Sequence, residues 1–203
     1  MSQQTTIPAP GFADATRDAQ LVFRAILDAL SQPARTFDLV SAPEAPAPLG
    51  PALGAVALTL LDDDCTVWLD PELANAPAVT SWLAFHTGAR TTDDPAAATF
   101  LFAVDVRALP SLATLAQGTD VAPHLSATVV LGVDPSTPMH TNVGRGPGIE
   151  STAFIAVPDT WPDFDAQWQA NTESFPRGVD VVLVTGSYVT AIPRTTRLER
   201  EDI

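Results

Sequence analysis

The clearest hydrophobic pattern in the chain predicts a helix from Thr16 to Leu30. Its apolar positions recur at intervals of three and four residues, which place them on one face of a helix; they are Leu21, Val22, Ala25, Ile26 and Ala29. Thr16 is a suitable N-cap, and Pro33 would end the helix. Further helices are predicted at 52–61, 77–86, 109–116 and 162–172.

The strongest strand signal lies near the end of the chain, at 179–184. This run is apolar with little alternation, as expected of a strand that is covered on both faces. A turn at Gly186 leads to a second strand at 188–192, which Pro193 ends because proline has no N–H to donate. Other strands are predicted at 36–40, 66–69, 99–106, 127–133 and 139–143. Strands that alternate with helices, followed by closing strand pairs, predict an α/β, three-layer domain around a mixed central sheet.

Length and composition favour a single domain. We expect a flexible N-terminal segment at 1–15 and one α/β domain at 16–203, because 203 residues can bury one substantial core. No apolar run reaches the roughly 18–20 residues that cross a bilayer. The first residues also lack the basic and apolar regions of a signal peptide. These features predict a cytoplasmic protein without membrane association.

The charge of the chain restricts its ligands. A net charge of −14 repels the phosphates of nucleic acids and anionic membranes, so neither is an expected partner. All ten basic residues are arginines. A pyridoxal phosphate enzyme needs a lysine for its Schiff base, and a Walker A loop needs a lysine on the phosphates. Both chemistries are therefore excluded, and we expect no cofactor.

The best candidate for binding an anion is the segment after Pro193, which consists of Arg194, Thr195, Thr196 and Arg197. Guanidinium groups bind phosphate or carboxylate through two parallel hydrogen bonds, and hydroxyl groups can complete the shell. The alternative is a solvated tail or an ion pair between subunits. Because the segment follows a strand end, we expect little of the fold to depend on Arg194.

Two other places could contact an anion. The glycine-rich stretch 144–148 could present backbone N–H groups beside Arg145, or it could be an irregular loop with unusual φ values. His86 stands at a predicted helix end, four residues before Arg90. It could act as a general base or bind phosphate. Alternatively, it could have a structural role, either by complementing the dipole at the helix C-terminus or by filling a partly buried position.

The remaining polar residues give weaker signals. The three aspartates at 62–64 are expected to be a solvated loop and not a magnesium site. The spacing of His86, His124 and His140 is not that of a zinc site, so no metal is expected. Cys65 is the single cysteine, which excludes an internal disulfide, and it is expected to pack and not to act as a nucleophile. Most of eight aromatic residues should lie in the core, and some could anchor a protein contact; they are the four tryptophans, Phe85, Phe154, Phe164 and Phe175.

Several segments resemble the PhnH family of the bacterial carbon–phosphorus lyase system. The most specific is 175–196, with its apolar run, Gly-Ser turn and Ile-Pro-Arg-Thr-Thr ending. The others follow in the expected order at 23–33, 60–69, 85–89, 98–100, 118–123 and 146–149. Ala34 departs from the pattern, because members usually carry glycine there; we expect a less tight turn at this position.

The resemblance implies a fold similar to that of pyridoxal-phosphate-dependent transferases, without the cofactor. It also implies a homodimer that acts with the complex subunits G, I, L and J. That assembly exchanges the adenine of ATP for a phosphonate, and this chain would support the exchange as a non-catalytic or accessory subunit, with a phosphonate or nucleotide at a subunit boundary. The alternative is an independent transferase or anion-binding protein that uses Arg194 and Arg145 in a retained cleft.

Overall fold

The structure, a computed structural model, describes residues 8–200. Residues 1–7 of the expected flexible segment lie outside the described residues. The α-helices are α1 (Ala15–Ser31), α2 (Gly50–Leu60), α3 (Pro71–Ala74), α4 (Pro77–Thr87) and α5 (Phe164–Glu173). The strands are β1 (Phe37–Asp38), β2 (Thr66–Leu69), β3 (Arg90–Thr91), β4 (Phe100–Ala103), β5 (Thr128–Val133), β6 (Met139–Arg145), β7 (Ala153–Pro158), β8 (Asp180–Thr185), β9 (Tyr188–Ile192) and β10 (Arg197–Arg200).

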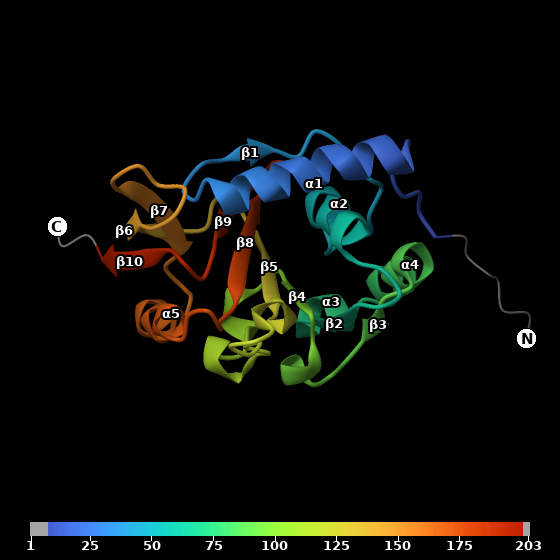
Figure 1. The fold of residues 1–203 in the computed structure, drawn as a ribbon. Coiled ribbons are helices and arrows are strands. Elements are labelled where there is room, and N and C mark those ends of the chain that lie inside the picture. Colours follow the sequence, from blue (N-terminus) through green and yellow to red (C-terminus); the bar gives the residue numbers. More distant parts are fainter. Residues whose placement is uncertain (1–7, 201–203) are drawn as a thin grey trace, which may run out of the picture.

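A seven-stranded mixed sheet runs through the centre, in the order β1-β9-β8-β5-β4-β2-β3 (Figure 1). Strands β3, β2, β4, β5 and β8 are parallel, whereas β9 runs antiparallel to β8 and to β1. A second sheet of three antiparallel strands has the order β10-β6-β7. The prediction of an α/β chain with a mixed central sheet is confirmed.

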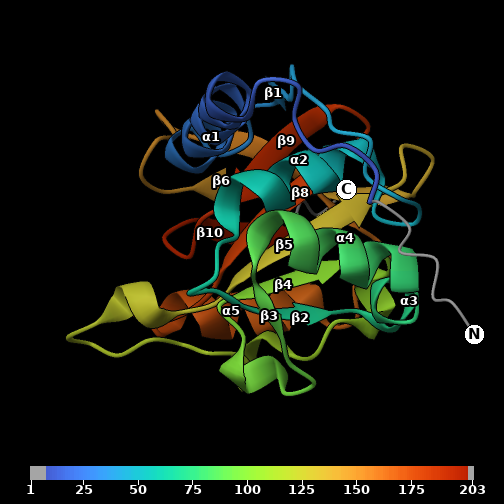
Figure 2. The ribbon, with the colours of Figure 1, turned by 90° about the vertical axis from the view of Figure 1, so that its right-hand side faces the viewer.

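The strand alternation of β8 divides the core into two layers. Val182 and Val184 pack with buried residues of α1, α2 and α4 on one face of the sheet. Val181 and Leu183 pack on the other face with α5, β7 and the 3₁₀ turns. The sheet therefore has a layer on each side (Figures 1 and 2). Burial on both faces explains why the β8 sequence is apolar throughout.

Three sequence predictions need correction. Helix α1 begins at Ala15, and its N-cap is Asp14, whose carboxylate accepts the Arg17 N–H at 3.0 Å; the expectation of Thr16 was wrong. The predicted strand at 99–106 ends at Ala103. The reason is that the buried carboxylate of Asp70 takes the next two backbone N–H groups, at 2.7 and 3.0 Å.

The predicted helix at 109–116 is also absent from the described residues. Only a 3₁₀ turn forms there, at Leu112–Thr114. The side-chain amide of Gln117 donates to the carbonyls of Leu112 and Leu115, at 2.7 and 3.0 Å, and so takes acceptors that a longer helix would use. Strands β3, β7 and β10 and helix α3 were not predicted.

The turn after α1 was expected to be less tight, because Ala34 stands where glycine is usual. Ala34 adopts a φ of +72°, in the left-handed region that favours glycine. The loop at Gly148 lies close to the start of this turn, because a Cβ on Gly148 would lie 2.1 Å from the Ser31 carbonyl oxygen and 2.9 Å from Pro33 Cδ. The tight turn is therefore kept with an alanine in a strained conformation.

Candidate functional site

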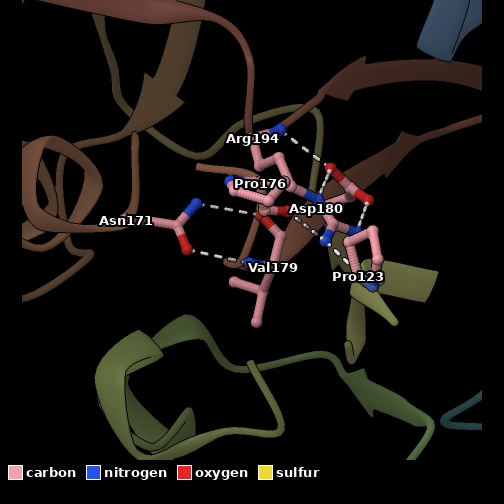
Figure 3. A network of polar contacts seen from close by, with 6 residues as sticks. All are labelled: Pro123, Asn171, Pro176, Val179, Asp180 and Arg194. Carbon is pink, nitrogen blue, oxygen red and sulfur yellow. Dashed lines mark hydrogen bonds and ion pairs between the residues drawn. The ribbon is translucent and has the colours of Figure 1, made fainter. Parts of the chain in front are cut away.

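Arg194 has its hydrogen-bonding partners within the chain. Strand β9 ends at Ile192, and the Arg194 backbone N–H donates to Asp180 Oδ1 at 2.8 Å. The guanidinium group meets both oxygens of the same carboxylate through Nε and Nη2. Its Nη1 donates to the carbonyls of Pro123 and Pro176, at 2.9 and 3.4 Å (Figure 3). The Arg194 and Asp180 side chains are only 14% and 21% exposed. The expectation that little of the fold depends on Arg194 was therefore wrong.

A buried asparagine stands beside this network and was missed at the sequence level. Asn171 lies on the core side of α5, where its amide donates to the Val179 carbonyl at 2.9 Å and accepts the Val179 N–H at 2.8 Å (Figure 3). The same side chain leaves no room for a larger residue at position 178, because a Cβ added to Gly178 would lie 2.9 Å from Asn171 Oδ1. An asparagine on the apolar face of a helix was the available signal, because buried amides need partners.

Of the two threonines after Arg194, Thr195 is partly buried and Thr196 belongs to the packed interior. Thr196 is fully buried, its N–H donates to the Pro193 carbonyl at 2.8 Å, and its carbonyl accepts the Trp168 indole N–H at 2.8 Å. Its hydroxyl oxygen has no hydrogen-bond partner among the described residues. The Thr195 carbonyl oxygen lies close to Gly146, because a Cβ on Gly146 would be only 2.8 Å from it. Burial removes the Thr196 hydroxyl from any ligand at the surface.

Arg145 and Arg197, 52 positions apart in the sequence, become cross-strand neighbours. Strand β10 pairs with β6 so that Arg197 lies opposite Arg145 and Glu199 opposite Val143. Opposed residues of antiparallel strands project to the same face, which is the exposed face here. Arg145 Nη1 lies 2.8 Å from Glu199 Oε2, with the side chains 51% and 71% exposed. Two guanidinium groups and one carboxylate thus form a small surface cluster with a surplus positive charge.

His86 lies in α4 and Arg90 in β3, and these two elements are at the other end of the molecule from β6 and β10 (Figure 1). His86 Nε2 is 2.9 Å from the Ala9 carbonyl oxygen, which also accepts the Trp82 indole N–H at 2.9 Å. A carbonyl can only accept, so Nε2 carries the proton in this contact. Arg90 is exposed in the edge strand β3. The structure does not bring this pair to Arg145 and Arg197.

A cavity of about 1020 Å³ has a different character. It lies between β6, the start of α5 and Arg200. His140 Nδ1 is 3.1 Å from Asp159 Oδ1, and Asp165 lies between His140 and Arg200, at 3.6 and 3.5 Å. Carboxylates outnumber cations on its walls, so it does not suit a phosphate. Sequence reasoning missed this cluster because its members come from four separate places, namely β6, the turn after β7, α5 and β10.

The remaining candidates have structural surroundings. The aspartates at 62–64 are exposed, and burial raises the pKa of the Cys65 thiol, which makes it a poor nucleophile. Within residues 8–200, no group of histidine, cysteine or acidic side chains has an arrangement that could hold a metal ion. No helix in that range is long and apolar enough to span a membrane. Trp82, Trp161, Trp168 and Phe164 are buried, as predicted, and Trp68 is partly buried. Phe85, Phe154 and Phe175 are 66%, 66% and 61% exposed, so the expectation of a core position was wrong for these three.

Comparison with known proteins gives a consistent result over nearly the whole chain. The family model described as "Bacterial phosphonate metabolism protein (PhnH)" matches residues 10–199. The chain is 43% identical over 204 aligned residues to "Alpha-D-ribose 1-methylphosphonate 5-triphosphate synthase subunit PhnH" of Rhizobium meliloti (strain 1021), covering 99% of this chain and 100% of the relative. It is 33% identical over 184 residues to "Putative C-P lyase subunit protein HtxG" of Stutzerimonas stutzeri, covering 88% and 85%.

Proposed function

Since the chain belongs to the PhnH family of bacterial phosphonate metabolism proteins, we propose that it is a subunit of a carbon–phosphorus lyase complex. In this role it supports the formation of a ribose 1-phosphonate 5-triphosphate from ATP and a phosphonate, a transferase reaction, together with subunits G, I and L. The observation that carries the proposal is the 43% identity to a synthase subunit across the full length of both chains.

The distribution of charge supports a subunit that does not work alone. The chain has ten cationic and 24 acidic side chains. Five of the arginines form ion pairs with aspartate or glutamate inside the described chain. A triphosphate normally needs several cationic partners. We therefore propose that Arg145 and Arg197 contribute to an anion site that a neighbouring subunit completes.

Further features belong to the same proposal. We infer a homodimer within the complex, contacts with subunit J, and a cytoplasmic location. The seven-stranded mixed sheet with a layer on each face supports a likeness to pyridoxal-phosphate-dependent transferases. Because the chain has no lysine, that likeness concerns the fold and not the cofactor. Residues 16–203 are proposed to form a single domain.

The test is reconstitution of the synthase from subunits of one organism. Purified G, I and L are incubated with ATP, magnesium and methylphosphonate, with and without this chain, and released adenine is measured by chromatography. We expect adenine release only when the chain is present. The double variant Arg145→Ala/Arg197→Ala should lower the rate at least tenfold, whereas Arg107→Ala, which removes an exposed arginine paired with Asp105, should not. Full release without the chain would refute the proposal, and release by the isolated chain would identify an independent enzyme.

A further inference from the structure

The buried polar side-chain atoms that have no hydrogen-bond partner gather at one place in the described part of the chain. They lie where β6 and the start of β10 pack against α5, and they belong to His140, Asn142, Asp165 and Thr196. Asn142 stands out, because it is fully buried and neither Nδ2 nor Oδ1 has a partner among residues 8–200. Buried polar groups are nearly always paired. Unpaired atoms that share one location therefore need a common explanation.

These atoms border the cavity of about 1020 Å³ between the small sheet and α5 (Figure 1). His140 and Asp165 line it directly. Asn142 lies two positions after His140 on β6 and opposite Arg200 on β10, so it projects from the same face of the sheet as these two lining residues. The volume is at the upper end of the roughly 300–1,000 Å³ that is usual for small-molecule sites. The unpaired atoms thus belong to the wall of a cavity that has room for a ligand.

His140 and Asp165 present two hydrogen-bond acceptors to each other. The Asp159 carboxylate accepts from His140 Nδ1 at 3.1 Å, so Nδ1 carries the proton of the neutral ring. Nε2 is then an acceptor, and it faces Asp165 Oδ1 at 3.6 Å. The Asp165 side chain is 40% exposed, so it can turn toward solvent and admit a group from the cavity. An N–H or O–H donor that enters here satisfies both acceptors.

The walls favour an uncharged ligand that is rich in donors. Three carboxylates face one guanidinium group across the cavity; they are Asp159, Asp163 and Asp165, opposite Arg200. Carboxylates repel phosphate groups but accept hydrogen bonds from hydroxyl and amino groups. Trp161 and Met139 add apolar surface on which a flat ring can pack. A nucleoside combines the required features, because it has donor hydroxyl and amino groups, a flat ring and no charge.

We propose that this cavity binds the uncharged nucleoside part of ATP, with a hydroxyl or amino group donating to Asp165 and His140 and with the phosphates directed out to solvent. The proposal rests on the proposed function for the identity of the nucleotide, since that reaction consumes ATP and releases adenine. Arg145 is not part of this cavity, because positions 140 and 142 of β6 face the inner side of the sheet and position 145 faces the outer side. The nucleoside site and the arginine pair can therefore be tested separately.

The experiment is calorimetric titration of the full chain with adenosine, adenine, methyl riboside, ethylammonium and magnesium-free ATP at matched ionic strength. We expect adenosine to bind with a Kd below about 1 mM, and at least about tenfold more tightly than ATP, whose phosphates meet the carboxylates. Adenine and methyl riboside show which half of the nucleoside carries the affinity. Asp165→Ala should weaken adenosine binding at least about tenfold. Asp120→Ala is the matched control, because Asp120 also pairs with an arginine, at 3.4 Å, but lies outside the cavity; it should change the Kd by less than about twofold.

Asn142→Leu separates a ligand contact from a structural role. Leucine is similar in volume and needs no hydrogen-bond partner, whereas an unpaired buried amide costs stability. The Tm of this variant should therefore equal or exceed that of the unaltered chain, while adenosine binds at least about fivefold more weakly. A lower Tm with unchanged adenosine affinity would show that the amide serves the fold alone and would contradict its place in the site.

The outcomes keep this inference apart from the proposed function. If the unaltered chain binds no adenosine, or binds ethylammonium in its place, the nucleoside site is refuted, and the reconstituted synthase still decides the proposed function. Equal affinity of the Asp165→Ala variant and the unaltered chain for adenosine would also refute the site. If adenosine binds as expected but the other subunits release adenine without this chain, the proposed function fails and the nucleoside site remains.

Discussion

Replacing Arg194 with alanine should destabilise the folded chain by about 2–4 kcal/mol. The variant keeps the backbone N–H that donates to Asp180 but loses the guanidinium group, with its two contacts to that carboxylate and its bonds to two carbonyls. Breaking a buried ion pair by removing one partner costs about 3–5 kcal/mol, and hydrogen bonds to charged groups contribute about 1.5–3 kcal/mol. Because the two side chains are 14% and 21% exposed, water recovers part of this loss and lowers the estimate.

The measurement is urea unfolding of the isolated chain, followed by circular dichroism. Arg107→Ala is the matched control, because its ion pair with Asp105 involves a guanidinium side chain that is 70% exposed, and such a change costs at most about 0.5 kcal/mol. A double-mutant cycle with Asp180→Asn should give a coupling energy of at least about 1 kcal/mol. If Arg194→Ala unfolds at the same urea concentration as Arg107→Ala, Arg194 is not a structural partner and becomes free to act as a ligand contact.

Three further changes test local features of the fold. Ala34→Gly should stabilise the chain by about 0.5–1 kcal/mol in thermal unfolding, because glycine relieves the left-handed φ of +72° at a smaller entropic cost; a loss of stability would contradict the strain. Asp14→Ala should cost about 1 kcal/mol through the lost N-cap, whereas Thr16→Ala should change stability by less than about 0.5 kcal/mol; equal effects would contradict the assigned helix start. Burial raises the pKa of the Cys65 thiol, so iodoacetamide at pH 8 should modify the folded chain at least tenfold more slowly than the urea-unfolded chain, and more rapidly as pH rises; equal rates would show that the thiol is exposed.

Much of the fold could be predicted because its core strands carry strong local signals. The run at 179–184 became β8, and the predicted strand at 66–69 has the bounds of β2. The failures occurred where side chains override the local pattern. The Asp70 carboxylate ends β4, and the Gln117 amide prevents a helix after Leu109. Neither the Asp70 bonds, which reach across 34 and 35 positions, nor the local Gln117 bonds leave a periodic trace in the sequence.

The candidate site was less predictable, because its residues are brought together by the pairing of strands that are far apart in the sequence. Arg194 and Arg197 are near one another in sequence and were expected to act together. Strand β10 was not predicted, and its pairing with β6 is what places Arg197 opposite Arg145. The partner of Arg194 also comes from outside the motif, since Asp180 begins β8 fourteen positions earlier. A cluster of like residues in sequence therefore did not indicate a cluster of like functions in space.

The place of Arg194 also changes how the chain can contribute to a shared site. The same guanidinium group that seemed available for an anion fixes the two loops that expose Val121, Leu125 and Phe175. The arginine pair at Arg145 and Arg197 remains at the surface, and one carboxylate, that of Glu199, offsets part of its charge. A pair with this surplus can hold one anionic group but not a triphosphate and a phosphonate together, because each added charge on the ligand needs a further cation. On the proposed function, the missing cations come from another chain of the complex. On this reasoning, Arg145→Ala/Arg197→Ala should lower the rate of the assembled synthase without lowering the amount of complex that assembles, and a loss of assembly that accounts for the whole loss of rate would contradict a role in anion binding.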